Sequence, residues 1–305
     1  MKKTTIRLFY FNGFLFVASL LVCSSLARGI SSVPANAKSV PNLVYKTVGG
    51  QRLQLDLYLP NGNSEPVPLV IYIHGGGWEK GSRHQCPAFG MVAKGFAVAS
   101  IDYRLSQIAL FPAQIIDCKA AVRWLRANAA KYGLDPNRFG VWGTSAGGQL
   151  AALLGTSGGV KDLEGDGENL EYSSRVQAVC AVAAPTDFRQ FGVARGGSGG
   201  SSARPQIGRR AQEALDGLFG SGDNRGALVV KASPIQYVSA DDPPFLILHG
   251  EFDRIVPLDQ SNRFYERLRD AGVKAKLKIM PNQGHQGALL AAVNDAEAFF
   301  ETTLK

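Results

Sequence analysis

The sequence contains few of the residues that build disulfide frameworks and metal centres. Its 305 residues include only four cysteines and four histidines. We find no cluster of cysteine, histidine and acidic residues with the spacing of a metal site, and no glycine fingerprint of a dinucleotide-binding fold. The sequence therefore predicts a protein that works without a cofactor.

An odd number of cysteines remains beyond the N-terminal segment. Cys86, Cys118 and Cys180 allow at most one disulfide within the chain and leave one thiol over. Cys118 lies on the apolar stripe of a predicted helix and Cys180 within an apolar run. Because a domain of this length does not need a disulfide framework, we expect buried thiols at both positions.

The apolar run near the N-terminus, Leu8–Cys23, is too short to cross a bilayer. It is interrupted by Asn12 and Gly13 and falls short of the ~20 residues that a membrane span requires. Basic residues precede it and small-x-small cleavage patterns follow it, namely Lys2, Lys3, Arg7, Ser25-Leu26-Ala27 and Ala35-Asn36-Ala37. This order is typical of a secretory signal peptide.

We therefore predict a signal peptide over residues 1–37 and a secreted or periplasmic domain over residues 38–305, without stable membrane insertion after cleavage. Two alternatives stay open. One is an uncleaved membrane anchor. The other is a lipoprotein at Cys23, although Leu20-Leu21-Val22 lacks the small residue that normally precedes a lipidated cysteine.

Charged residues make up only 19% of the chain, and 45% of its residues are hydrophobic, as in globular proteins. The formal net charge is +8, but four basic residues and no acidic residue lie in the first 37 positions, which leaves +4 for the rest. A second basic cluster falls in one Gly/Ser-rich stretch: Arg195, Arg204, Arg209 and Arg210. The excess positive charge thus lies in two short segments and does not form a continuous basic face. We therefore expect no nucleic-acid partner.

From Val44 onward, short apolar runs alternate with longer amphipathic segments. Val44–Leu59 alternates apolar and polar residues around Gly49-Gly50, which predicts an antiparallel hairpin. Further strands are predicted at Leu69–Ile73, Phe96–Ile101, Arg138–Trp142, Val176–Ala183, Pro244–Leu248 and Lys274–Ile279. Helical spacing of apolar residues occurs in Pro112–Tyr132, Gly147–Leu154, Leu258–Leu268 and Leu289–Phe300. The alternation predicts an α/β fold with a mainly parallel central sheet and helices on both faces.

The pattern Gly-x-Ser-x-Gly occurs three times, around Ser145, Ser157 and Ser198. Gly196–Gly200 has no strand before it, and Gly155–Gly159 follows a helix, where glycines commonly end the helix. Only Ser145 has a predicted strand before it and a predicted helix after it. That context is typical of a nucleophile elbow, in which a strained turn exposes the serine hydroxyl. Ser145 is therefore the predicted nucleophile.

A serine on such an elbow is followed along the chain by an acid and then by a histidine. The four histidines are His74, His84, His249 and His285. His285 comes after the last predicted strand and the turn Pro281–Gly284, where a loop can carry it over the sheet edge, so it is the predicted base.

Asp253 lies five residues beyond the strand Pro244–Leu248 and before His285, which fits the position of the acid. Glu251 is a nearby rival. Asp102 and Asp117 precede the serine, and we expect them to form structural salt bridges. The predicted triad is Ser145, Asp253 and His285.

Hydrolysis also needs donors for the oxyanion. The amide of Ala146 follows the nucleophile at the start of a helix, and the turn Gly75–Gly77 lets further N–H groups approach a carbonyl because it has no Cβ atoms.

These motifs resemble those of the α/β-hydrolase superfamily, most closely the bacterial feruloyl-esterase-like branch related to hormone-sensitive-lipase-type esterases. The resembling segments are His74-Gly75-Gly76-Gly77-Trp78, Asp102-Tyr103-Arg104-Leu105, Gly143–Gly148, His249-Gly250-x-x-Asp253 and Gly284-His285. The resemblance implies a cofactor-free serine ester hydrolase, often acting on acylated plant polysaccharides or small aryl and acetyl esters. It assigns the oxyanion donors to Gly76, Gly77 and Ala146. The chain departs from the family pattern at Gln149, where a histidine is expected, and in an insertion over residues 191–227.

This insertion is rich in glycine, serine and arginine around one short predicted helix, Gln206–Phe219. Leu215 and Phe219 are its main large apolar residues, too few to bury a tight lid. We expect a flexible polar flap before the acid-bearing loop, which favours soluble or carbohydrate-linked esters and can attract a carboxylated polymer. A solvated surface loop is the alternative.

The sequence thus predicts a secreted serine carboxylic ester hydrolase that works through an acyl-enzyme on short-acyl, aryl or carbohydrate-linked acetyl and feruloyl esters. Its expected partner is a small-molecule or polysaccharide-linked ester. A serine peptidase of the prolyl-oligopeptidase type shares this triad order, but nothing resembling its propeller precedes the first hairpin. A non-catalytic hydrolase-fold binding protein is the other alternative, although such proteins typically lose a triad member and this chain retains all three.

Overall fold

The computed structural model describes residues 33–35, 37–62, 64–191 and 208–305. The chain divides into two units, Met1–Ser31 and Ser32–Lys305, and all helices and strands given below belong to the second. Most of the predicted signal peptide and residues 192–207 of the predicted flap lie outside the described residues.

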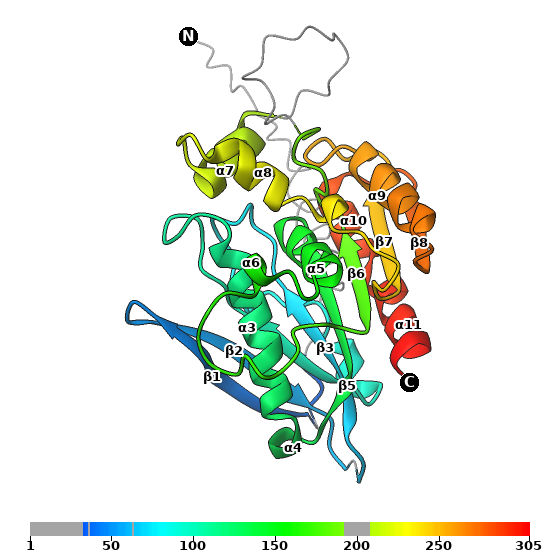
Figure 1. The fold of residues 1–305 in the computed structure, drawn as a ribbon. Helices are drawn as coiled ribbons and strands as arrows, with labels where there is room; N and C mark the ends of the chain where they lie inside the picture. Colours follow the sequence, from blue (N-terminus) through cyan, green and yellow to red (C-terminus); the bar gives the residue numbers. More distant parts are fainter. Residues whose placement is uncertain (1–32, 36, 63, 192–207) are drawn as a thin grey trace, which may run out of the picture. The chain divides into compact units, whose positions relative to one another are not determined.

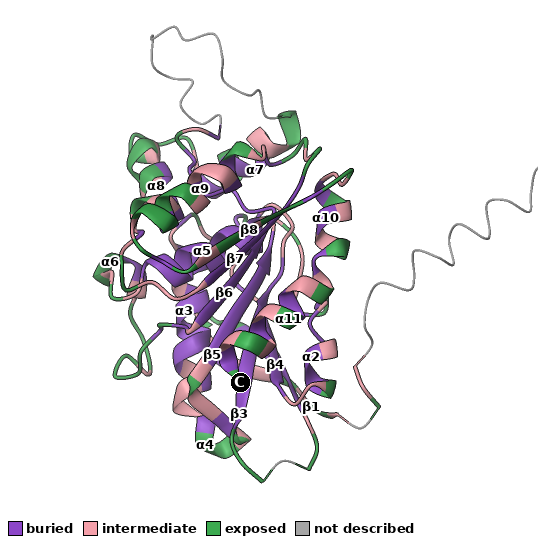
Figure 2. Cartoon of the chain, turned by 90° about the vertical axis from the view of Figure 1, so that its right-hand side faces the viewer, coloured by how far each residue is buried: buried purple, intermediate pink, exposed green. Residues whose placement is uncertain are grey.

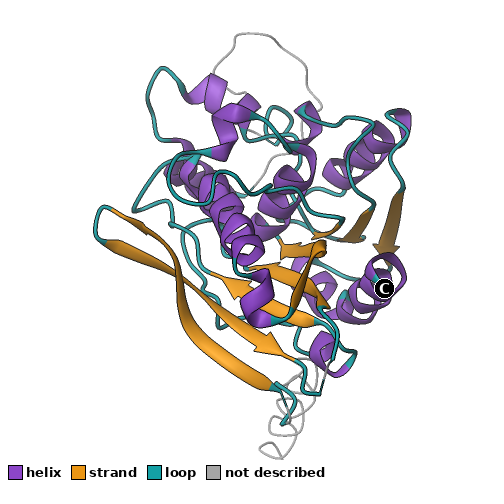
Figure 3. Cartoon of the chain, turned by 60° about the horizontal axis from the view of Figure 1, so that its bottom comes forward, coloured by secondary structure: helices purple, strands orange, loops and turns teal. Residues whose placement is uncertain are grey.

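Within the described residues, the strands form one eight-stranded sheet in the order β1-β2-β4-β3-β5-β6-β7-β8 (Figure 1). Their bounds are β1 Lys38–Val48, β2 Gln51–Leu59, β3 Val67–Ile73, β4 Ala97–Ile101, β5 Leu134–Thr144, β6 Ala178–Val182, β7 Phe245–Gly250 and β8 Ala275–Met280. β2 pairs antiparallel with β1 and with β4, whereas every pair from β4 to β8 is parallel. The β1–β2 hairpin lies at one end of the sheet and β8 at the other (Figure 3). The predicted, mainly parallel sheet with an N-terminal antiparallel hairpin is confirmed.

The inner strands are buried on both faces of the sheet. All seven residues of β3 are buried. Leu69, Ile71 and Ile73 belong to one apolar core, whereas Val70 and Tyr72 belong to the other. Successive side chains of a strand point to opposite faces, so a strand that is covered twice has a continuous apolar sequence.

Helices cover both faces of the sheet (Figure 2). Their bounds are α2 Gly90–Ala93, α3 Ala113–Ala127, α4 Ala129–Tyr132, α5 Ala146–Thr156, α6 Lys161–Glu164, α7 Arg209–Phe219, α8 Arg225–Lys231, α9 Asp259–Asp270, α10 His285–Ala291 and α11 Val293–Leu304, with a 3₁₀ turn η1 at Pro234–Gln236. Residues of α3, α5 and α9 pack in the first core, and residues of α2, α10 and α11 pack in the second. In the described part of the chain, no helix has the length and apolarity to cross a membrane.

The helix predicted at Leu289–Phe300 starts earlier in the structure and is divided into α10 and α11. Ala292 lies between the two helices and is fully buried against the sheet. Apolar residues continue at helical spacing across this break, so periodicity alone predicts a single helix.

The described part of the predicted flap is packed onto the body of the domain. α7 buries Ala214, Leu215, Leu218 and Phe219, and the ring of Phe219 lies 5.4 Å from that of Phe188. Residues 209–219 therefore form a docked amphipathic helix and not a loose loop. Four apolar residues on one face are enough to bury that face.

Cys86, Cys118 and Cys180 are buried free thiols. The expectation of buried thiols at Cys118 and Cys180 is thus confirmed. Burial raises the pKa of the Cys86 thiol to about 12, so this thiol is poorly reactive.

Candidate active site

Ser145 occupies a sharp turn between the end of β5 at Thr144 and the start of α5 at Ala146. Its backbone has φ 56° and ψ −120°, a region that non-glycine residues rarely adopt. The Ser145 N–H donates to the Val182 carbonyl at 2.8 Å, which ties the turn to the neighbouring strand β6. The strained serine is the feature expected of a nucleophile elbow.

The glycines on either side of Ser145 are required by the close approach of strand and helix. A Cβ on Gly143 would lie 2.0 Å from the Gly147 carbonyl oxygen, and a Cβ on Gly147 would lie 2.2 Å from the Ile73 carbonyl oxygen. Real Cβ atoms do not come this close to backbone atoms. The elbow therefore excludes every side chain at these two positions.

The structure brings Ser145, His285 and Asp253 together. His285 Nε2 lies 2.9 Å from Ser145 Oγ, and His285 Nδ1 lies 2.6 Å from Asp253 Oδ2. The three residues come from the ends of β5, β8 and β7, which meet at one edge of the parallel sheet. An imidazole between a hydroxyl and a carboxylate can take a proton from the first while the second fixes its tautomer.

The Asp253 carboxylate is completely buried. Burial alone would raise its pKa, but hydrogen bonds from His249 and His285, and from the Val256 backbone, outweigh that effect and hold the pKa of Asp253 well below its usual range. Asp253 Oδ1 accepts the N–H groups of Ile255 and Val256, both at 2.9 Å. The carboxylate therefore stays ionised beside the imidazole.

The other acidic candidates lie elsewhere. Glu251 is exposed, and its carboxylate accepts the Asn282 N–H at 3.0 Å. Asp102 pairs with Arg83 at 2.5 Å and Asp117 with Arg104 at 2.7 Å, so both form the expected salt bridges.

Ser157, the second serine of the repeated pattern, is fully buried directly after α5. Its hydroxyl donates to the Leu153 carbonyl at 2.5 Å. Ser198 lies outside the described residues. Of the two pattern serines that the structure describes, Ser145 and Ser157, only Ser145 is within hydrogen-bond distance of a histidine.

Ser145 and His285 line a cavity of about 270 Å³. Gly76, Gly77 and Ala146 line the same cavity, as the oxyanion assignment requires. Gly76 has φ +111°, and a Cβ there would lie 2.1 Å from the Lys80 carbonyl oxygen, so this turn can only form with glycine.

Comparison with known proteins shows the family. Residues 55–268 match the BD-FAE family model. The chain belongs to the BD-FAE family. This is a family of α/β-hydrolase esterases, so the predicted superfamily and fold are confirmed. The matched range includes Ser145 and Asp253, whereas His285 lies beyond it.

Several known proteins are similar to this BD-FAE chain. Esterase LipC of Mycobacterium tuberculosis is 33% identical over 232 residues, which are 74% of the chain and 55% of LipC. The chain spans about half the length of the curated relatives it matches. A truncated form of a carbohydrate esterase from gut microbiota has a TM-score of 0.77 at 32% identity, covering 90% of the chain and 99% of that protein. Thermogutta terrifontis esterase 2, phosphonylated by sarin, has a TM-score of 0.73 at 25% identity, covering 89% and 96%.

His249 is a supporting residue that the sequence analysis did not assign. It is fully buried, and its Nε2 lies 2.9 Å from the Val256 carbonyl and 3.4 Å from Asp253 Oδ2. Both of these atoms are acceptors, so Nε2 carries the proton, and Nδ1 accepts the Ser261 hydroxyl at 2.6 Å. His249 thereby fixes the turn that carries the acid. The spacing His249-Gly250-x-x-Asp253 was the available signal.

Gln149 and Trp78 form a second support, behind the glycine turn. The Trp78 indole N–H donates to Gln149 Oε1 at 3.0 Å, and Gln149 Nε2 donates to the Ala232 carbonyl at 2.8 Å. Gln149, which stands where the family pattern has a histidine, thus has a structural role. The buried amide links the glycine turn to the segment after α8.

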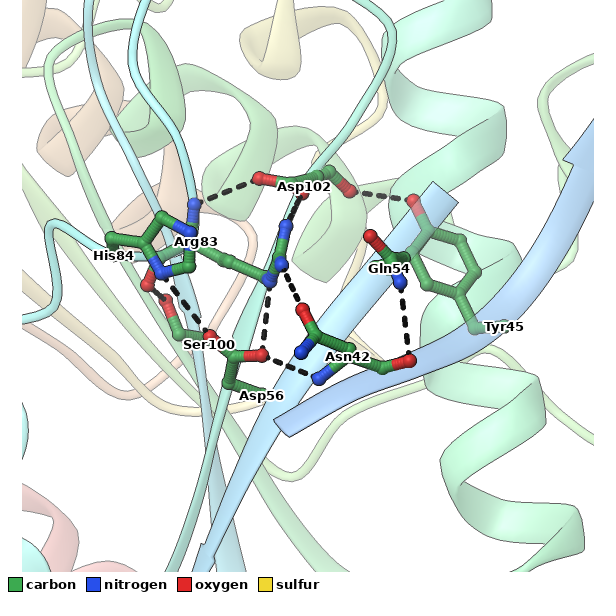
Figure 4. A network of polar contacts seen from close by, with 8 residues as sticks. All are labelled: Asn42, Tyr45, Gln54, Asp56, Arg83, His84, Ser100 and Asp102. Atoms are coloured by element: carbon green, nitrogen blue, oxygen red, sulfur yellow. Dashed lines mark hydrogen bonds and ion pairs between the residues drawn. The ribbon is translucent and has the colours of Figure 1, made fainter. Parts of the chain in front are cut away.

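Arg83 anchors the loop that follows the glycine turn, in the polar network shown in Figure 4. Its guanidinium contacts Asp56 at 2.9 Å, Asp102 at 2.5 Å and Asn42 at 2.5 Å. The exposed ring of His84 lies 3.3 Å from the same Asp56. The remaining histidine, His74, stacks on Tyr103 with the ring centroids 4.4 Å apart, and its Nδ1 lies 2.8 Å from the Gly75 carbonyl oxygen. The polar contacts of His74 and His84 are thus made with Gly75 and Asp56 and not with Ser145.

Proposed function

We propose that the chain is a serine carboxylic ester hydrolase with Ser145 as nucleophile, His285 as general base and Asp253 as the acid that orients it. The observation that carries this proposal is the continuous run of hydrogen bonds from Ser145 to His285 at 2.9 Å and on to Asp253 at 2.6 Å. A serine hydroxyl attacks a carbonyl only when a base removes its proton. Membership of a family of α/β-hydrolase esterases supports the assignment.

In the acylation step, Ser145 Oγ attacks the ester carbonyl carbon while His285 Nε2 takes the hydroxyl proton. The buried Asp253 carboxylate stabilises the imidazolium that forms. The backbone N–H groups of Ala146, Gly76 and Gly77 donate hydrogen bonds to the carbonyl oxygen as it becomes negatively charged. When the tetrahedral intermediate collapses, His285 returns the proton to the leaving alcohol, and the acyl group remains on Ser145.

In the deacylation step, water takes the place of the alcohol. His285 removes a proton from the water as it attacks the acyl carbon, and the same N–H groups donate hydrogen bonds to the oxyanion. Collapse of this second intermediate breaks the bond to Ser145 Oγ. His285 returns the proton to Ser145, which releases the carboxylic acid and restores the free enzyme.

The proposed substrates are esters of short acyl, aryl or carbohydrate-linked type, including acetyl and feruloyl esters. A cavity of about 270 Å³ lies just below the ~300 to 1,000 Å³ that is typical of small-molecule sites, which favours short acyl groups. The similarity to a carbohydrate esterase from gut microbiota supports a carbohydrate-linked alcohol. An acetyl ester should be preferred to a palmitoyl ester in kcat/KM, and the reverse preference would contradict this substrate class.

A fluorophosphonate probe tests the proposed nucleophile. The wild-type protein should be labelled once, at Ser145, and the Ser145→Ala variant should not react, whereas Ser157→Ala should react like wild type. Turnover of p-nitrophenyl acetate with no turnover of aminoacyl anilides would favour the esterase over the serine peptidase. A folded wild-type protein that neither reacts nor turns over either substrate would favour the non-catalytic binding protein.

We further propose that residues 1–37 direct export. Expression of the full chain in a bacterial host, followed by N-terminal sequencing of the product outside the cytoplasm, tests this. A mature N-terminus at Arg28 or Lys38 supports cleavage at one of the two predicted positions. An intact N-terminus on cytoplasmic protein would contradict it.

A further inference from the structure

The cavity beside Ser145 contains charged residues that the reaction itself does not use. Its apolar lining includes Pro185, Phe191, Ala214, Ile255, Val256 and Leu289. Its charged lining consists of Glu79, Lys80 and Arg210. Two cations and one carboxylate leave a local excess of one positive charge next to the nucleophile.

Arg210 has no carboxylate partner among the described residues. The two acidic residues of its own helix, Glu213 and Asp216, pair with other arginines. Glu213 lies 3.7 Å from Arg209 on the exposed side of α7. Asp216 accepts Arg225 at 2.6 Å and Gln212 at 2.9 Å. The guanidinium of Arg210 is therefore left for solvent or for a ligand in the cavity that it lines.

Lys80 is held directly behind the glycine turn. Its backbone N–H donates to the Gly76 carbonyl at 3.2 Å, and its own carbonyl oxygen would lie 2.1 Å from a Cβ on Gly76. Within the described part of the chain, Lys80 likewise has no ion pair. Lys80 is thus attached by its backbone to the turn that carries the proposed oxyanion donors Gly76 and Gly77.

We propose that this cavity selects esters that carry a carboxylate, with Arg210 and Lys80 as its binding partners. The proposal rests on the esterase function proposed above and names the substrate class of the same site. An arginine fork can hold a carboxylate by two parallel hydrogen bonds, and a lysine adds a point charge. Glu79 opposes this binding and limits it to ligands that reach the two cations. A uronic acid residue next to an acylated sugar hydroxyl has this chemistry.

Paired probes of equal size separate charge from reactivity. On the alcohol side, 4-acetoxybenzoate is compared with 4-acetoxybenzamide. On the acyl side, ethyl hydrogen adipate is compared with the compound in which a primary amide replaces its free carboxyl group and the ethyl ester is kept. The quantity measured is the ratio of kcat/KM for the charged probe to that for the neutral one. Differences in intrinsic reactivity cancel when this ratio is compared between wild type and variants.

We expect Arg210→Gln to lower the ratio about tenfold in at least one pair, the size of a lost charge-assisted hydrogen bond, and Lys80→Gln to lower it less. Glu79→Gln should raise it. Arg209→Gln, one residue away and paired with Glu213, is the matched control and should leave it unchanged. Added salt should reduce the wild-type ratio because it screens exposed charges.

The outcomes separate the two proposals. Absence of turnover for both neutral probes would contradict the esterase function itself. If the neutral probes are hydrolysed but Arg210→Gln and Lys80→Gln leave both ratios unchanged, the carboxylate site is wrong and the esterase stands. A fall in the ratio that Arg209→Gln reproduces would show only a general surface charge effect, which also overturns the site.

Discussion

The two ends of helix α5 carry the same five-residue pattern but differ in backbone conformation, burial and hydrogen bonding. At the N-terminal end, Ser145 has a strained backbone and lines a cavity. At the C-terminal end, Ser157 has φ −102° and ψ 27°, is fully buried and donates its hydroxyl to Leu153. The same letters therefore describe a candidate nucleophile at one end and a helix stop at the other.

The helix itself explains why only one of its ends suits the chemistry. The N-terminus of a helix carries unpaired N–H groups and a partial positive charge, which stabilise a developing oxyanion. The C-terminus carries carbonyl groups and a partial negative charge, which would repel it. The pattern Gly-x-Ser-x-Gly therefore indicates a nucleophile only where a strand precedes it and a helix begins after the serine.

The largest contrast between the two ends should appear in turnover. Ser145→Ala or His285→Ala should lower kcat on the order of a million-fold, as removal of either partner does in a well-studied protease. Ser157→Ala should stay close to wild type, since its hydroxyl contacts only a backbone carbonyl within its helix. Steady-state assays with p-nitrophenyl acetate measure all three. A comparable loss of kcat in Ser157→Ala would show that the assignment of Ser145 as the nucleophile is wrong.

Asp253→Asn tests how Ser145, the serine at the N-terminal end of α5, is activated. The amide keeps the shape of the side chain but favours the wrong imidazole tautomer, so we expect kcat to fall about 10⁴-fold by analogy with serine proteases. Glu251→Gln is the matched control and should be mild, because Glu251 is exposed. A large loss in Glu251→Gln with a mild effect in Asp253→Asn would move the acid by two residues.

Glycine substitutions sharpen the comparison in terms of stability. The last glycine of each pattern is Gly147 at one end and Gly159 at the other. Gly147→Ala drives a Cβ into backbone atoms and should cost about 3 kcal/mol or more of unfolding free energy. Gly159 has φ +82°, and a Cβ there would make only an ordinary contact, 3.9 Å from the Arg175 guanidinium, so Gly159→Ala should cost about 1 kcal/mol. Urea denaturation measures both, and equal losses would contradict the steric account.

His249 supplies the smallest expected effect. Glutamine can place a donor where His249 Nε2 lies, whereas asparagine cannot reach that position. His249→Asn should lower kcat about tenfold through a displaced Asp253, with little change in KM, and His249→Gln should retain most of it. A rise in KM with unchanged kcat, or equal losses in both variants, would show that His249 does not position the acid.

Local patterns in the sequence were sufficient to predict the sheet and the candidate triad residues. The buried run of β3 and the order of Ser145, Asp253 and His285 are properties of consecutive or ordered positions. The parallel strands then bring their carboxyl ends to one edge. The structure places the predicted residues within hydrogen-bond distance, and their catalytic roles stay predictions.

Other features depend on partners that are distant in the sequence. Gln149 bonds to Trp78 and Ala232, which are 71 and 83 residues away. The docking of α7 depends on the ring of Phe188 meeting Phe219. No local pattern specifies these pairings, because each becomes defined only when the whole fold is formed.

All eleven residues of α5 are buried. A helix of this length is marginal on its own in water and has no exposed face on which it could persist when detached. Its amides should therefore exchange with deuterium only when the entire domain opens, at the slow limit of native-state exchange. The strained turn at Ser145 cannot relax by local fraying. The conformation of a single serine is thus maintained by the global stability of the domain.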